Sequence, residues 1–215
     1  MATFAELIDR TDILVQDPSL TDMLGDFINQ GVDEIAGGMQ SVLGSWLTPP
    51  LPLLFIIDTV TTSTSAAYVE MPEEFHRGLQ MVVDSSGREI SIEHSFIEFT
   101  ETYPLLNKTG NISVAVEHGN KLYYQGIPVN SEILTLHFYR KPVIMVLDAD
   151  MPDGLPSHLQ IPLLTNYAAW KAYEFIEIDA LEESTSLQKF MGAFLIALKT
   201  LELSIPDYTR GLFLR

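Results

Sequence analysis

Three aspartates and a glycine lie close together in one short stretch and offer the chain's best set of cation ligands. Asp148, Asp150 and Asp153 are followed by Gly154, and calcium prefers the carboxylate oxygens that such a loop supplies. The spacing differs from that of an EF-hand, in which a bidentate glutamate would stand where this chain has Leu159. The alternative is a solvated loop before a helix, where acids interact favourably with the helix dipole. The sequence leaves open whether this loop binds an ion.

The other residues that could support acid–base, nucleophilic or metal chemistry are scattered. The five histidines lack the i, i+4 pairing and the His-Glu-x-x-His pattern of metalloenzymes. Glu73–Glu74 and Glu182–Glu183 are adjacent in sequence, so the two side chains of each pair do not face each other, and we interpret them as surface charge. Nucleophile-elbow, phosphate-binding and dinucleotide-binding motifs are absent. We therefore predict no catalytic, cofactor-binding or metal-binding residue and a protein that is not an enzyme. The histidines are His76, His94, His118, His137 and His158.

Composition narrows the class of protein. The 215 residues are 47% hydrophobic and 19% charged, which is typical of a packed globular chain. The formal net charge of -17 excludes nucleic-acid binding by counterion release, which needs clustered lysines and arginines. The absence of cysteine excludes disulfides and zinc–thiolate sites. The most apolar run, residues 51–57, is shorter than the roughly 20 residues that span a bilayer, and the acidic N-terminus differs from a signal peptide. We expect a cytosolic protein, or part of a particle assembled in a cytosol.

The hydrophobic period changes twice along the chain. Apolar residues recur at helical spacing over residues 3–16 and 20–35, at the two-residue period of strands over 53–140, and again at helical spacing over 155–179 and 187–203. We predict an α+β fold: a helical bundle built from both chain ends, with a β-rich insertion between them and an extended C-terminal arm. The predicted parts are residues 1–47, the N-terminal helices; 53–142, the insertion; 143–203, the helices that complete the bundle; and 204–215, the arm.

The stretch 155–179 is the longest predicted helix and is apolar around most of its circumference. Gln160, Lys171 and Glu174 form its one narrow polar stripe, which we expect to be its solvent-facing edge. A helix this apolar is enclosed on several sides, either by its own domain or by another subunit. We predict that it packs against the N-terminal helices and, sideways, against the next subunit. The predicted subunit-contact residues are Leu163, Tyr167, Trp170 and Tyr173.

The C-terminal arm is unusually apolar for a chain terminus. Termini are commonly polar and mobile, and exposed aromatic and aliphatic side chains there promote aggregation. One interpretation is that the arm folds back on its own helices. The other is that it orders on a partner, with its aromatic residues as anchors. The predicted partner-binding residues are Ile205, Tyr208, Leu212, Phe213, Leu214 and Arg215.

Several short motifs follow one another in a set order over residues 20–180. In sequence order they are Leu24-Gly-Asp-Phe-Ile28-Asn29 with Glu34-Ile35; Thr61-Thr62-Ser63; Tyr68, Pro72 and Phe75; Tyr139-Arg140-Lys141-Pro142; Leu155-Pro156; Tyr167-Ala168; and Ala172-Tyr173-Glu174. Each motif is short, and their order resembles that of the head-to-tail connector proteins of tailed bacteriophages, the portal adaptors.

The resemblance implies a structural virion protein at the head-to-tail interface, assembled in the host cytoplasm. Such adaptors form a homo-oligomeric ring, expected to be a dodecamer, which binds the portal protein, receives the tail or stopper protein and extends the channel for DNA ejection. The resemblance also implies that the C-terminal arm reaches the portal or a neighbouring subunit. An acidic chain fits a channel through which double-stranded DNA passes without specific binding. No cofactor and no membrane contact are expected.

One alternative stays open at this point. The β-rich segment contains aromatic residues, among them Tyr103, Tyr123 and Tyr124, that a non-enzymatic ligand- or carbohydrate-binding module could present. Such a module would belong to a virion or to a cytosolic assembly.

Overall fold

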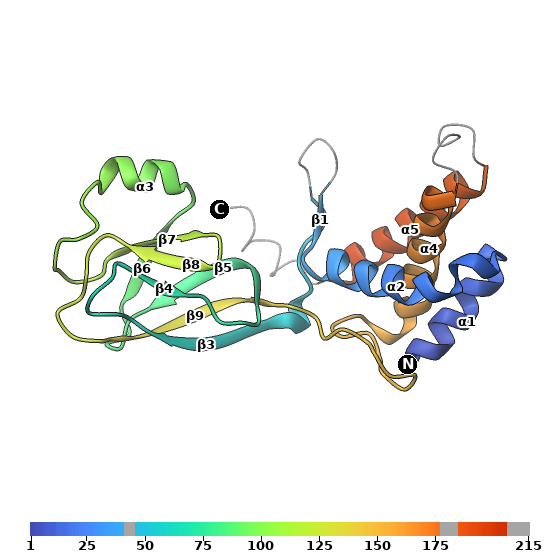
Figure 1. Cartoon of the computed structure of the whole chain (residues 1–215), viewed down its shortest axis with the longest axis horizontal. Coiled ribbons are helices and arrows are strands. Elements are labelled where there is room, and N and C mark those ends of the chain that lie inside the picture. The colour runs from blue at the N-terminus through green and yellow to red at the C-terminus, as the bar shows by residue number, and fades with distance from the viewer. Residues whose placement is uncertain (41–45, 177–184, 206–215) are drawn as a thin grey trace. The chain divides into compact units, whose positions relative to one another are not determined.

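The computed structural model describes residues 1–40, 46–176 and 185–205, and the chain divides into two compact units (Figure 1). The first, which we call the helical unit, contains residues 1–54 and 141–215. The second, the sheet unit, contains residues 55–140. Each unit has a hydrophobic core of its own.

The helical unit is organised around its longest described helices. Helix α4, Ser157–Ile176, packs against α1, Phe4–Val15, against α2, Thr21–Ala36, and against α5, Thr185–Ser204. Two short 3-10 turns, η1 at Pro18–Leu20 and η2 at Pro52–Leu54, and a small antiparallel pair, β1 at Met39–Gln40 and β2 at Trp46–Thr48, complete the described part of this unit. Because α4 contacts three other helices, most of its circumference is covered, as its apolar sequence requires.

Local sequence explains where these helices begin and end. The hydroxyl of Thr3 caps α1 by accepting from the Glu6 amide at 3.3 Å. Gln16 ends α1 in the left-handed conformation, with a φ of 55°. Helix α2 ends at Gly37, and Gly38 follows with a φ of 79°, a conformation that favours glycine. The paired glycines therefore end α2 and allow the chain to enter β1.

The sheet unit contains one seven-stranded sheet. Its order is β3-β9-β5-β6-β7-β8-β4, and every neighbouring pair is antiparallel except β6 and β7, which are parallel. Helix α3, Phe96–Thr102, lies in the connection between the parallel strands. The strands are β3 Phe55–Thr61, β4 Tyr68–Glu70, β5 Phe75–Val83, β6 Glu89–Glu93, β7 Val114–His118, β8 Lys121–Tyr124 and β9 Ile133–Arg140.

The predicted fold class is wrong. A helical bundle from both chain ends with a β-rich insertion and an extended arm was expected, whereas the structure has a seven-stranded mixed sheet curled into a half-barrel, with helices. Register irregularities in β5, between Phe75 and Arg77 and between Arg77 and Met81, are of the kind that bends a strand. The edge strands β3 and β4 contact each other, consistent with this curl. The alternation of apolar and polar residues predicts which side chains of a strand share a face, but not which strands pair with one another. The curl of the sheet and the parallel pairing of β6 with β7 therefore could not be predicted from it.

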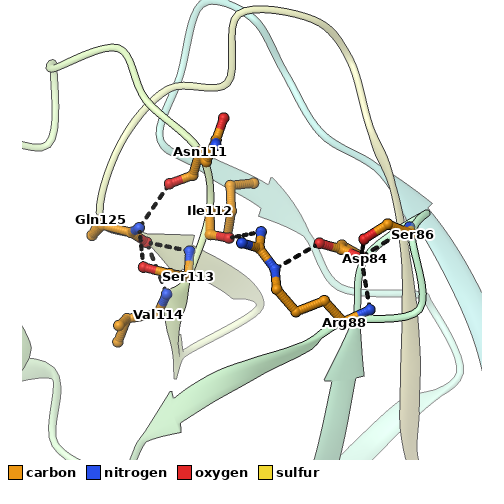
Figure 2. A network of polar contacts seen from close by, with 8 residues as sticks. All are labelled: Asp84, Ser86, Arg88, Asn111, Ile112, Ser113, Val114 and Gln125. Atoms are coloured by element: carbon orange, nitrogen blue, oxygen red, sulfur yellow. Dashed lines mark hydrogen bonds and ion pairs between the residues drawn. The ribbon is translucent and has the colours of Figure 1, made fainter.

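A polar network fixes the turn after β5 to the segment that enters β7 (Figure 2). Asp84 Oδ1 accepts from the Ser86 hydroxyl at 2.6 Å and from the Arg88 amide at 2.9 Å. Arg88 Nη2 then donates to the Ile112 carbonyl at 3.0 Å. Beside it, Gln125 Oε1 accepts from the Val114 amide at 3.0 Å. These hydrogen bonds fix the segment that follows the α3 connection, where β7 must begin in register with β6.

Candidate functional site

The four predicted subunit-contact residues of α4 all contact other parts of their own chain. Leu163 and Tyr167 are fully buried in the core of the helical unit. Trp170 stacks on Phe194 of α5 with ring centroids 5.9 Å apart. Tyr173 stacks on Phe190 at 5.6 Å, and its hydroxyl donates to the Val15 carbonyl. Trp170 and Tyr173 are half-buried, and their contact with a neighbouring subunit stays a prediction.

Tyr167 also carries an unusual polar atom. Its hydroxyl is buried and has no hydrogen-bond partner in the part of the chain that the structure describes. Burial, with a smaller effect from the Glu34 carboxylate, raises the pKa of Tyr167 well above its ordinary value. The hydroxyl therefore stays protonated, and the ring serves as packing.

The predicted solvent-facing stripe of α4 is wrong at Gln160. That side chain is only 2% exposed. Its Oε1 accepts from the Ala2 amide at 2.9 Å, and its Nε2 donates to the Leu155 carbonyl at 3.2 Å. Lys171 and Glu174 do form a surface ion pair, at 2.8 Å. Gln160 instead connects the start of the chain and the loop before α4 to the helix, and such polar groups are buried only when they are bonded.

Of the predicted partner-binding residues in the arm, only Ile205 lies among the described residues. It is 5% exposed and belongs to the core of the helical unit. The other predicted arm residues, Tyr208, Leu212, Phe213, Leu214 and Arg215, lie outside the described residues. A test of the arm should therefore begin after Ile205, because removal of a core side chain would destabilise the unit by itself.

The loop between β9 and α4 exposes a patch of aliphatic side chains. Val143, Ile144, Val146 and Leu147 are 65%, 69%, 74% and 67% exposed, while Met145 between them is buried. We call these four exposed residues the aliphatic loop. Single exposed apolar residues are ordinary on a protein surface, but four within one five-residue run concentrate apolar exposure in one loop, and concentrated apolar exposure marks interaction sites.

Hydrogen bonds hold the aliphatic loop in place. The Asn29 side chain, from α2, donates to the Met145 carbonyl and accepts from the Met145 amide, both at 3.0 Å. Asp150 Oδ2 accepts from the Val146 and Leu147 amides at 2.7 and 2.8 Å. These two bonds lower the pKa of Asp150 below its ordinary value. The exposed side chains are thus presented by a backbone with defined bonds.

The same loop caps the start of α1. The Phe4 amide donates to the Asp150 carbonyl at 2.8 Å, and the Ala5 amide donates to the Asp148 carbonyl at 3.2 Å. The first amides of a helix have no partner within it, so these carbonyls satisfy groups that would otherwise need water.

A shallow groove of about 210 Å³ lies beside the loop and is lined by Asn29, Gln30, Val32, Asp33, Pro142, Val143 and Ile144.

Two of the aspartates considered as possible cation ligands accept hydrogen bonds within the loop. Asp150 accepts from two loop amides, and Asp153 Oδ2 accepts from the Val143 amide at 3.1 Å. Within the described residues, no group of three or more histidine, aspartate or glutamate side chains is arranged to hold a metal ion.

No described helix is long and apolar enough to cross a membrane.

The aromatic residues of the sheet unit mostly pack on one another. Phe96 stacks on His118 with centroids 4.2 Å apart, and Tyr123 lies 5.0 Å from Phe96. Tyr103 packs on Phe99 at 5.3 Å. Tyr124 is fully buried, with its hydroxyl bonded to backbone groups of residues 63–68. Tyr124 is therefore a core residue and does not present its ring to a ligand.

A comparison with protein families identifies the relationship. The profile of the SU10 adaptor protein family matches residues 2–211. The chain belongs to this family. Membership confirms the resemblance to bacteriophage adaptors and supports a structural virion protein that interacts with other virion proteins. A search of curated proteins found no match to the chain.

The aliphatic loop is the surface that sequence reasoning missed. Residues 143–147 are Val-Ile-Met-Val-Leu, a continuous apolar run directly after Pro142. A short continuous apolar run is typical of a fully buried strand, so no signal in the sequence predicts that these side chains are exposed. In the sequence, the aspartates after this run suggest a possible cation site. In the structure, Asp150 and Asp153 accept hydrogen bonds from the backbone amides of the run.

Proposed function

We propose that this chain is the adaptor subunit of a ring, expected to be a dodecamer, that joins the portal protein to the tail or stopper protein and extends the DNA channel at the head-to-tail interface. The observation that carries the proposal is the family match over residues 2–211. The exposed, hydrogen-bonded aliphatic loop supports it, since a structural adaptor works through apolar contacts with other virion proteins.

Charge supports the same role. The formal net charge of -17 fits a subunit whose channel-lining surface repels the phosphates of passing DNA. Double-stranded DNA then passes through the ring and is not bound specifically. No cofactor takes part.

The arm after Ile205 is proposed to bind the portal. Its apolar side chains, Tyr208, Leu212, Phe213 and Leu214, supply the anchors that typically contribute most of the free energy of such an interface. The experiment mixes purified chain with heads that carry the portal but lack connectors, and measures co-sedimentation. The full chain should co-sediment, and a chain that lacks residues 206–215 should not, although its unfolding temperature should match that of the full chain.

A matched pair of variants controls for arm length. One variant replaces the four apolar arm residues by serine, and the other replaces Asp207, Thr209 and Arg210 by serine. Only the first should lose attachment to heads. If the full chain fails to co-sediment with portal-bearing heads at all, the proposed function is wrong; if the apolar-to-serine variant attaches normally, only the role of the arm is wrong.

A further inference from the structure

Helix α5 has a second apolar surface in addition to the one that packs on α4. Phe190, Phe194 and Leu201 face the core. On its outer side, Leu195, Ile196 and Leu203 are 42%, 73% and 70% exposed. We call these three exposed residues, with Lys189 and Lys199 beside them, the α5 face. An amphipathic surface helix needs only one apolar side, so the exposed one is not required for packing among the described residues of the unit.

The α5 face and the aliphatic loop lie on different sides of the helical unit. The loop is hydrogen-bonded to α1 through Phe4 and to α2 through Asn29. Helix α5 packs instead on α4, which also contacts α1 and α2. In Figure 1 the loop that enters α4 runs near the N-terminus, away from α5. One unit thus carries two separate apolar surfaces.

The charges beside these two surfaces are complementary. Helix α5 contains two lysines, Lys189 and Lys199, and one acid, Glu202, which forms an ion pair with Lys199. It is still the one described helix with a positive formal charge. Helices α1 and α2, to which the aliphatic loop is bonded, contain one basic residue, Arg10. Their acidic residues are Glu6, Asp9, Asp12, Asp22, Asp26, Asp33 and Glu34.

We infer that the aliphatic loop of one copy packs against the α5 face of the next copy, with the α5 lysines beside the acidic α1 and α2 surface. The inference rests on the proposed adaptor function and names the two faces that join its subunits. Contact between two different surfaces is heterologous, and repeated heterologous contacts close into a ring when the rotation permits. Apolar side chains meet at the centre of this interface, and the opposite charges fix its register.

Cysteine cross-linking tests this pairing directly, because the chain has no cysteine of its own. Val146→Cys places one thiol on the aliphatic loop, and Ile196→Cys places one on the α5 face. A mixture of these two single variants, concentrated and treated with a short bismaleimide, should give a cross-linked dimer that neither variant gives alone. The double variant should give a ladder of higher species. A control mixture pairs Ile196→Cys with Ile97→Cys, which lies on α3 of the sheet unit and is 70% exposed, and should give no dimer.

A second set of variants measures association without cross-linking. Val146→Asp and Ile196→Asp should each weaken self-association by about tenfold or more, the usual effect of disrupting a central apolar contact. Ile97→Asp should leave it unchanged. Dimers formed by either single cysteine variant alone would show an isologous contact and would overturn the pairing. The pairing would also be wrong if the double variant gave no ladder, either in solution or on heads that the chain binds.

The two proposals fail in different ways. A chain that co-sediments with portal-bearing heads but gives no ladder overturns the pairing and leaves the adaptor function intact. A chain that gives the ladder but does not co-sediment with the heads overturns the adaptor function and leaves the pairing of the two faces intact.

Discussion

Gly31 of α2 lies directly against the ring of Tyr167 of α4, so a Cβ atom at position 31 would be 2.7 Å from Tyr167 Cδ1. Tyr167 is fully buried, and Phe194 of α5 packs edge-on to its ring at 5.3 Å. The ring therefore has little room to withdraw. This contact sets how closely α2 and α4 approach, since only glycine leaves space for the tyrosine.

Replacement of Gly31 by alanine should destabilise the helical unit. Overpacking a filled core costs about 1–3 kcal/mol, more than alanine gains from its better helix propensity. Gly192→Ala in α5 is the matched control, because nothing lies within 4 Å of a Cβ there. That variant should be neutral or more stable by up to about 1 kcal/mol. Urea unfolding of both variants measures the difference, and equal free energies of unfolding would contradict the close contact.

Asn29→Ala should loosen the aliphatic loop. The substitution removes both hydrogen bonds to Met145, whose amide and carbonyl then lose their partner, at a cost of about 1–3 kcal/mol. Gln30→Ala, at the exposed neighbouring position of α2, should change the free energy of unfolding by less than about 0.5 kcal/mol. Hydrogen exchange at residues 145–147 reports the loop itself. Unchanged protection there in Asn29→Ala would mean that the bonds do not hold the loop.

Gln160→Leu tests whether this side chain is structural. The leucine would leave the Ala2 amide and the Leu155 carbonyl without their partner, so the free energy of unfolding should fall by about 1–3 kcal/mol. The same change at exposed Gln30 should be near neutral. Thermal unfolding of both variants gives the comparison. A neutral Gln160→Leu would instead fit the solvent-facing stripe that the sequence predicted.

Helices and strand faces were the most predictable part of the fold. The helical period over residues 155–179 corresponds to α4 at Ser157–Ile176. The alternation along β9 puts Leu134, Leu136 and Phe138 on one face, and all three are buried. These signals are local, because side-chain direction depends only on the geometry of the element itself.

Features that depend on distant segments could not be predicted in the same way. Gln160 has a polar position on the helix surface, but the start of the chain and the loop before α4 cover it. The parallel pairing of β6 with β7 depends on the α3 connection. A hydrophobic period assigns residues to faces, while the choice of what covers each face is made by the tertiary structure.

The turn after β5 should weaken in acid. Hydrogen bonds, first from the Ser86 hydroxyl and then from the Arg88 amide, lower the pKa of Asp84 to about 2. A folded-state pKa below the unfolded value means that the carboxylate's contribution to stability is complete above about pH 4. It is lost as the pH falls towards about 2. Urea unfolding of the native chain and of Asp84→Asn should therefore differ most near neutral pH and converge in acid. Glu89→Gln, at an exposed position of β6, is the control and should stay close to the native chain throughout. A difference between native and Asp84→Asn that stays constant with pH would contradict the lowered pKa.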